Sequence, residues 1–354
     1  MMKFQLPFMM LAIVNLFAGM LAGLIRIGWD FPVSSFSVHH GAIMVGGFLG
    51  TLILLEKVIP LKKKILFLFP VINALGLLIL VPGFYQFGLS FLVIGALGLL
   101  LVFLIYLKRQ RHDLSIMLMV VAAGCQIGGH ITLISTQFYP MAFPWWMGFI
   151  LFIIVGERVE LSKFLPVTKQ HKTLLVGFMS LFLVGLCLPF HGIGKYLSGV
   201  ALILIAIWLM RHDVISIAIK KNGLTRFSGT ALLIGCINLL FTGLFLVSLP
   251  DIPFAYDAIV HTFFLGFAFT MIFAHGPIIL PGVLGFNVKP YHPLLYVPLI
   301  SLVISLILRL LADTSVLPYF LRLWSGWISV GSIVLYFILL FTFTVRNASH
   351  AKAI

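Results

Sequence analysis

Long hydrophobic stretches separated by short polar segments make up most of the chain, and this pattern predicts membrane-spanning helices. A stretch of about 20 apolar residues crosses the hydrocarbon core of a bilayer as an α-helix. Twelve stretches fit this description, with expected limits of 7–29, 38–60, 65–83, 86–107, 114–137, 145–165, 173–191, 192–210, 228–249, 257–280, 293–313 and 322–345. Because the connections are short, we expect an all-α fold with a single integral membrane domain over residues 1–354.

The composition agrees with a polytopic membrane protein and excludes a soluble one. Hydrophobic residues make up 62% of the chain, charged residues 9%, and the mean hydropathy is +1.19. The net charge of +14 does not indicate nucleic-acid binding, because the basic residues lie between the apolar stretches rather than in one patch. No CxxCH or Walker A motif occurs, so covalent c-type haem and ATP hydrolysis have no support in the sequence.

The distribution of lysine and arginine predicts the orientation in the membrane. With twelve spans, 19 of these residues fall on the side that carries both termini and 4 on the other. Because basic residues concentrate in cytoplasmic loops, both termini are expected in the cytoplasm of a bacterial cell, with the protein in its inner membrane.

A sequence echo suggests an internal repeat. The fourth predicted helix ends at Arg111-His112-Asp113, and the eighth ends at Arg211-His212-Asp213. This spacing predicts three units of four helices, 1–113, 114–227 and 228–354. The alternative is that Arg-His-Asp only marks the end of a span at the membrane surface.

Histidines near the outer membrane surface are the main chemical signal. Imidazoles on separate helices can ligate a haem iron or copper, although a single histidine at this level more often hydrogen-bonds to water. The histidines expected at this level are His39, His40, His130, His191 and His261.

Of the two adjacent histidines, His40 is the preferred ligand. Successive residues of a helix point about 100° apart, and His40 shares a face with Met44, Gly47 and Thr51. His39 is the alternative, as a supporting residue or a copper ligand. Arg26 and Arg309, near the outer ends of their spans, are candidate partners of a haem propionate; the alternative is that they extend to the membrane surface.

A second polar level is expected at the cytoplasmic side. It would form either a proton path or an ion-pair network. Its members are Glu56, Glu157, Arg158, Glu160 and His275. The sequence His275-Gly276-Pro277 is also expected to kink or end its helix.

Two short stretches and the topology resemble known families. Twelve helices with outer-level histidines on the second and tenth resemble subunit I of the haem–copper oxidases. The stretch His261-Thr262-Phe263-Phe264-Leu265-Gly266 and the glycine-rich second helix resemble the NnrS-type proteins. The sixth helix, however, has Trp145-Trp146-Met147-Gly148 where the oxidases carry a copper-ligating histidine.

The resemblance implies a non-covalent b-type haem held by His40 (or His39) and His261, with copper as a further metal. It also implies nitric oxide handling, electron transfer or redox sensing, with a redox partner or a small gas as the interacting species. Two other function classes stay open. One is a transporter or proton channel that uses Glu157, Glu160 and His275, and the other is a scaffold subunit without chemistry.

Overall fold

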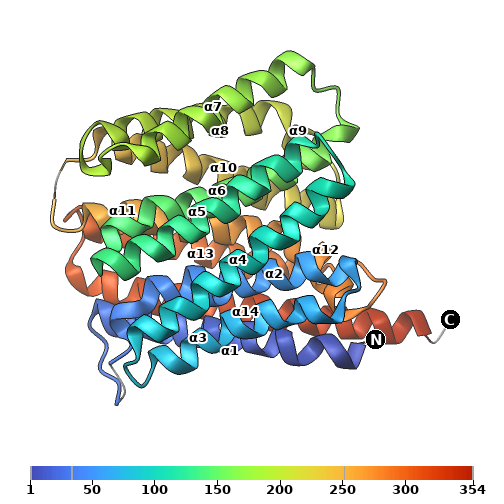
Figure 1. Cartoon of the computed structure of the whole chain (residues 1–354), viewed down its shortest axis with the longest axis horizontal. Helices are drawn as coiled ribbons and strands as arrows, with labels where there is room; N and C mark the ends of the chain where they lie inside the picture. Colours follow the sequence, from blue (N-terminus) through green and yellow to red (C-terminus); the bar gives the residue numbers. More distant parts are fainter. Residues whose placement is uncertain (1, 33–34, 251, 353–354) are drawn as a thin grey trace. The chain divides into compact units, whose positions relative to one another are not determined.

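The computed structural model describes residues 2–32, 35–250 and 252–352, and these residues form helices and connecting turns without a strand (Figure 1). Eleven helices in this part of the chain are long and apolar enough to cross a membrane, and Lys64–Leu80 is a shorter apolar helix. The helical segments thus follow the twelve predicted stretches, the third being the short one. They are the helices of a multi-pass membrane protein.

The chain divides into two compact units, Met1–Val159 and Glu160–Ile354. The long helices of the first unit are α1 (Met2–Ile27), α3 (Leu68–Leu80), α4 (Tyr85–Arg109), α5 (Leu114–Thr136) and α6 (Tyr139–Leu161). Within this unit, α4 packs against both α3 and α5. The threefold repeat stays a prediction, because the two units do not test it.

The second predicted span is not one regular α-helix. It consists of a 3-10 turn η1 (Ser37–His39), a π-helical segment η2 (Ala42–Gly50), the α-helix α2 (Thr51–Val58) and a 3-10 turn η3 (Ile59–Leu61). A further 3-10 turn, η4 (Lys64–Phe67), leads into α3. Since π-helices are rare and concentrate at functional sites, the residues around η2 are candidates for a functional site.

The second unit contains a corresponding interruption. Its elements are η5 (Ser162–Phe164), α7 (Lys169–Cys187), η6 (Phe190–Gly194), α8 (Lys195–His212), α9 (Ile215–Ala218), α10 (Gly223–Ser248), α11 (Ala255–His261), the π-helical η7 (Thr262–Phe269), α12 (Thr270–Leu284), η8 (Pro293–Leu295), α13 (Tyr296–Asp313) and α14 (Tyr319–Lys352). In this unit α10 packs against α8 and α12, and α13 against α14. The tenth predicted span is therefore built from α11, η7 and α12.

Three boundaries differ from the prediction. The helix does not end at His275-Gly276-Pro277, because α12 continues through Pro277 and Pro281 to Gly285, whose positive φ of 75° terminates it. Prolines are tolerated within membrane helices where neighbouring groups satisfy the freed carbonyls. The chain between α7 and α8 leaves the helix at Leu188-Pro189 and is again non-helical at Gly192, where the break was predicted. The helix α6 begins at Tyr139 rather than at Trp145.

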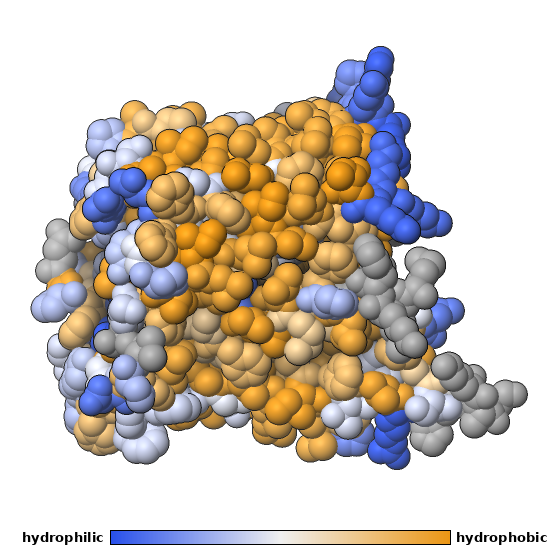
Figure 2. Space-filling view, turned by 60° about the horizontal axis from the view of Figure 1, so that its bottom comes forward, coloured by the Kyte–Doolittle hydropathy of each residue, from blue (hydrophilic) through white to orange (hydrophobic). Residues whose placement is uncertain are grey.

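The surface in Figure 2 shows how the polar residues are distributed. Hydrophobic side chains cover the middle of the face in view, and hydrophilic side chains gather toward its two ends. This distribution is the one that a bilayer requires, since charged side chains are costly within its hydrocarbon core.

Candidate functional site

His40 lies between the η1 turn and the π-helical segment η2, and its ring is held against α1. Its Nδ1 lies 2.7 Å from the carbonyl oxygen of Gly19, and since a carbonyl can only accept, Nδ1–H is the donor. Gly23 makes room for the ring, because a Cβ at this position would lie 2.8 Å from Cε1 of His40. The hydrogen bond fixes the tautomer in which Nε2 carries the lone pair.

His261, in the second unit, also donates from Nδ1 to a backbone carbonyl, but to one on its own helix. It is the last residue of α11, and η7 begins at the next residue, Thr262. Its Nδ1 donates to the carbonyl oxygen of Asp257 over 2.9 Å and lies 3.3 Å from the carboxylate of the same residue. Nε2 is again the nitrogen with the lone pair, as it is in His275, whose Nδ1 donates to Met271 over 2.7 Å.

The surroundings of the two π-helical segments also match. Asn15 on α1 packs against Gly47 of η2, and Asn238 on α10 packs against Gly266 of η7. Each asparagine donates to the carbonyl four residues earlier on its own helix, over 2.9 Å in both cases. Because glycine lacks a Cβ, each asparagine side chain occupies the space beside the π-helical segment that a Cβ would fill.

His130 on α5 is completely buried, with 0% of its surface exposed. Neither ring nitrogen has a hydrogen-bond partner among the described residues. Its ring meets Trp146 edge to face, with 5.8 Å between centroids, and a Cβ on Gly46 would lie 2.7 Å from its Cε1. An unpaired polar group in an apolar interior is costly, so His130 is a candidate for binding a group from outside the chain.

The ring of His39 has a different partner from that of His40. Its Nδ1 shares a hydrogen bond of 2.8 Å with the hydroxyl of Tyr139, and its ring lies 4.3 Å from that of Tyr85. Burial lowers the pKa of His39 below its ordinary value of 6.5, because the charged imidazolium loses solvation. His39 is therefore a neutral residue paired with a tyrosine, and His191, in the second unit, is exposed.

At the predicted cytoplasmic level, a lysine of the first unit bridges the carboxylates of Glu56 and Glu157. Lys57 lies 2.8 Å from Glu56 and 2.7 Å from Glu157. Arg158 is buried and Glu160 is exposed. Glu56 and Glu157 thus form ion pairs with Lys57, and the choice between a proton path and an ion-pair network for this level stays a prediction.

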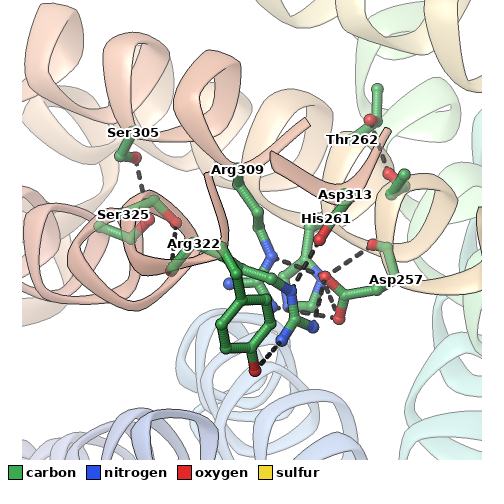
Figure 3. Close-up of polar contacts among 11 residues, drawn as sticks. Asp257, His261, Thr262, Ser305, Arg309, Asp313, Arg322 and Ser325 are labelled. Carbon is green, nitrogen blue, oxygen red and sulfur yellow. Dashed lines mark hydrogen bonds and ion pairs between the residues drawn. The ribbon is translucent and has the colours of Figure 1, made fainter. Parts of the chain in front are cut away.

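The second unit contains a charge cluster that the sequence pattern did not indicate (Figure 3). Arg309 makes two hydrogen bonds to the carboxylate of Asp257, of 2.8 and 3.1 Å. Arg322 lies 3.3 Å from the same carboxylate and donates to Asp313 over 2.7 Å. Arg309 and Arg322 interrupt apolar stretches in the sequence, and this pattern could have indicated a buried charge cluster. Their partner Asp257 lies on α11, which only folding brings close.

This cluster bears on the residues considered for a haem propionate. The guanidinium of Arg309 already has a carboxylate partner within the chain, Asp257. Arg26, the other candidate, is exposed in the last turn of α1. Among the described residues, no group of three or more His, Cys, Asp or Glu side chains is arranged to hold a metal ion.

Comparison with known proteins gives one match. A family described as a domain of unknown function (DUF8744) matches residues 5–345. The chain belongs to this family. No curated protein and no solved structure matches the chain.

Proposed function

We propose that this protein is a membrane protein that binds a non-covalent b-type haem through His40 and His261. It acts in nitric oxide handling, electron transfer or redox sensing in the inner membrane of a bacterium, as the resemblance to the NnrS-type proteins implies. One observation carries the proposal. Both imidazoles donate from Nδ1 to a backbone carbonyl, and a π-helical segment begins one residue after His261 and two residues after His40.

The hydrogen bonds of these two histidines suit ligation. A histidine that binds a metal does so as a neutral ring, and a hydrogen bond from its second nitrogen fixes the tautomer and orients the ring. The carbonyls of Gly19 and Asp257 have this role for His40 and His261, each within its own unit. The carboxylate of Asp257, 3.3 Å from Nδ1 of His261, would also increase the basicity of that ring.

His130 adds a second kind of support. The ring nitrogens of this buried imidazole have no hydrogen-bond partner among the described residues, so they can bond to a metal ion or another group from outside the chain. Within the first unit, His130 is therefore the candidate for a further ligand, to haem iron or to copper. When bound, haem would supply one-electron redox chemistry. The surrounding protein residues would orient the ligating histidine rings and exclude water.

Absorption spectra and metal analysis of the purified protein test this proposal. We expect a Soret band and stoichiometric iron, both lost in His40→Ala and His261→Ala. His191→Ala is the control that keeps them, since His191 is exposed. A change of the Soret band on adding nitric oxide to the reduced protein would support the role in nitric oxide handling.

Two results would contradict the proposal at different levels. A protein without a Soret band and without stoichiometric iron or copper binds neither cofactor, and the proposal fails. A Soret band that survives in both alanine variants refutes the ligand pair but leaves haem binding in place. In that case His130→Ala tests the remaining buried imidazole of the first unit.

A further inference from the structure

The first unit contains a cavity of about 220 Å³ that the proposed haem ligation does not use. It lies where η1, the start of α4, the end of α5 and the start of α6 come together. Its wall combines apolar and polar side chains, including Leu133, Gln137 and Tyr139. His39, Tyr85 and Gln86 also line it. All of these residues belong to the first unit.

The polar part of the wall suits a neutral ligand with hydrogen-bonding oxygens. His39 and Tyr139 are bonded to each other over 2.8 Å, and together they can both donate and accept. The side-chain amides of Gln86 and Gln137 add further donors and acceptors to the wall. None of the described residues that line the cavity is a lysine or an arginine, so the wall offers no cation to a carboxylate or a phosphate.

The size of the cavity limits the ligand to about one substituted ring. An engineered cavity of about 150 Å³ holds benzene. Pockets for drug-sized molecules have volumes of roughly 300–1,000 Å³. A cavity of about 220 Å³ therefore accepts a six-membered ring with small substituents, while a sterol or a whole lipid is too large. The ring of Tyr85, tilted by 44° against that of His39, offers an aromatic surface to such a ligand.

The rim indicates where the ligand comes from. Large apolar side chains next to the lining residues are exposed, among them Phe84 and Phe87 beside Tyr85 and Gln86. Phe138 is also exposed, between Gln137 and Tyr139. These exposed apolar side chains lie at or beside the ends of predicted spans, where lipid and water meet, so the cavity is suited to a ligand whose apolar tail remains in the bilayer.

We propose that this cavity binds the ring of a membrane-soluble quinone or quinol. A quinone combines the features that the wall and rim require: one flat six-membered ring, neutral oxygens that hydrogen-bond, and an apolar tail that remains in the lipid. Because His39 and Tyr139 share one hydrogen bond, either the Nε2–H of His39 or the hydroxyl of Tyr139 donates to a ring oxygen, and Tyr85 packs on the ring. This inference concerns binding only, and it stands whether or not the protein holds haem.

Photolabelling of the full-length protein in lipid nanodiscs tests the inference. The probe is an azido-substituted ubiquinone with a short isoprenoid tail, and mass spectrometry locates the label. We expect labelling of peptides that include residues 84–89 or 133–139 and protection by unlabelled decylubiquinone. Tyr139→Phe removes one hydroxyl and should weaken protection roughly fivefold, the effect of one hydrogen bond of about 1 kcal/mol.

Two further variants complete the design. Leu133→Trp fills the cavity and should abolish specific labelling, whereas Tyr196→Phe, at an exposed tyrosine of the second unit, should change nothing. If Leu133→Trp does not fold, Tyr139→Phe still decides. Label that lies elsewhere, or protection that is equal in Tyr139→Phe and the wild type, overturns the inference. Equal protection by oleate would also overturn it, since the cavity would then accept any acyl chain.

The same samples separate this inference from the proposed haem binding. Spectra recorded before labelling report the haem, and His40→Ala should leave quinone protection within error of the wild type. A wild-type protein that lacks a Soret band but shows specific labelling and protection contradicts the proposed haem binding and leaves the quinone site in place. Loss of protection in Tyr139→Phe with an unchanged Soret band supports two distinct sites.

Discussion

His39 illustrates how much a single residue depends on its surroundings. The sequence placed it beside His40 as an alternative ligand, but its ring is directed to Tyr139 and Tyr85. Adjacent residues on a helix point in different directions, which explains why the two histidines diverge. The partner of each ring, a tyrosine for His39 and a backbone carbonyl for His40, depends on helices distant in the sequence.

The lowered pKa of His39 predicts a pH-dependent stability. In the unfolded chain the imidazole titrates near its ordinary value of 6.5, whereas burial holds the folded pKa below it. As the pH falls through this window, the unfolded chain takes up the proton first, so the folded state loses stability. The melting temperature of the wild type should therefore fall between about pH 7.5 and about pH 5.5.

His39→Gln is the variant that isolates this effect. Glutamine keeps a hydrogen-bonding group near Tyr139 but does not titrate, so its melting temperature should fall less over the same pH range. Differential scanning fluorimetry in detergent measures both proteins. Other histidines contribute equally to the two curves, so parallel curves would mean that His39 does not titrate in this window.

At the scale of elements, the close contact between η2 and α5 depends on glycine. A Cβ on Gly46 would lie 2.7 Å from His130 and 2.8 Å from Leu92, closer than packed side chains approach. Gly46→Ala should therefore destabilise the protein by about 1–3 kcal/mol, the usual cost of overpacking a core. Unfolding in mixed micelles measures the change.

Gly124→Ala on α5 is the matched control. A Cβ there meets no atom within 4 Å, and alanine favours a helix more than glycine does. This variant should be as stable as the wild type or slightly more so. Equal losses in both variants would show that glycine matters for the backbone of the helices rather than for the contact with His130.

The elements themselves were predictable to different degrees. Hydrophobic stretches located the helices because a bilayer requires long apolar segments. The π-helical segments η2 and η7 were not predicted, since their local sequences are as apolar as those of ordinary spans. A π-helical turn forms where packing stabilises it, here beside Asn15 and Asn238 on the preceding helices.

At the scale of the whole molecule, the orientation in the membrane is a prediction from charge. Reporter fusions test it. A C-terminal green fluorescent protein should fluoresce and a C-terminal alkaline phosphatase should be inactive, because both termini are expected in the cytoplasm. Alkaline phosphatase fused after Leu249, in a predicted outer loop, should be active. The reverse pattern at these two positions would invert the assignment of every histidine level.

The sequence by itself determined that the chain is a helical membrane protein, where most spans begin and end, and which histidines could take part in chemistry. These properties follow from composition and from short-range pattern, because the bilayer acts on each span separately. It also determined the expected orientation, which depends only on where the basic residues fall.

Only the tertiary structure decided what each polar side chain contacts. Arg309 and Asp257 are 52 residues apart in the chain and form a bidentate ion pair. The ring nitrogens of His130 are buried and have no hydrogen-bond partner among the described residues. The cavity beside His39 likewise requires four segments to converge. Such contacts arise from the packing of distant helices, and hydrophobic periodicity carries no information about which helices those are.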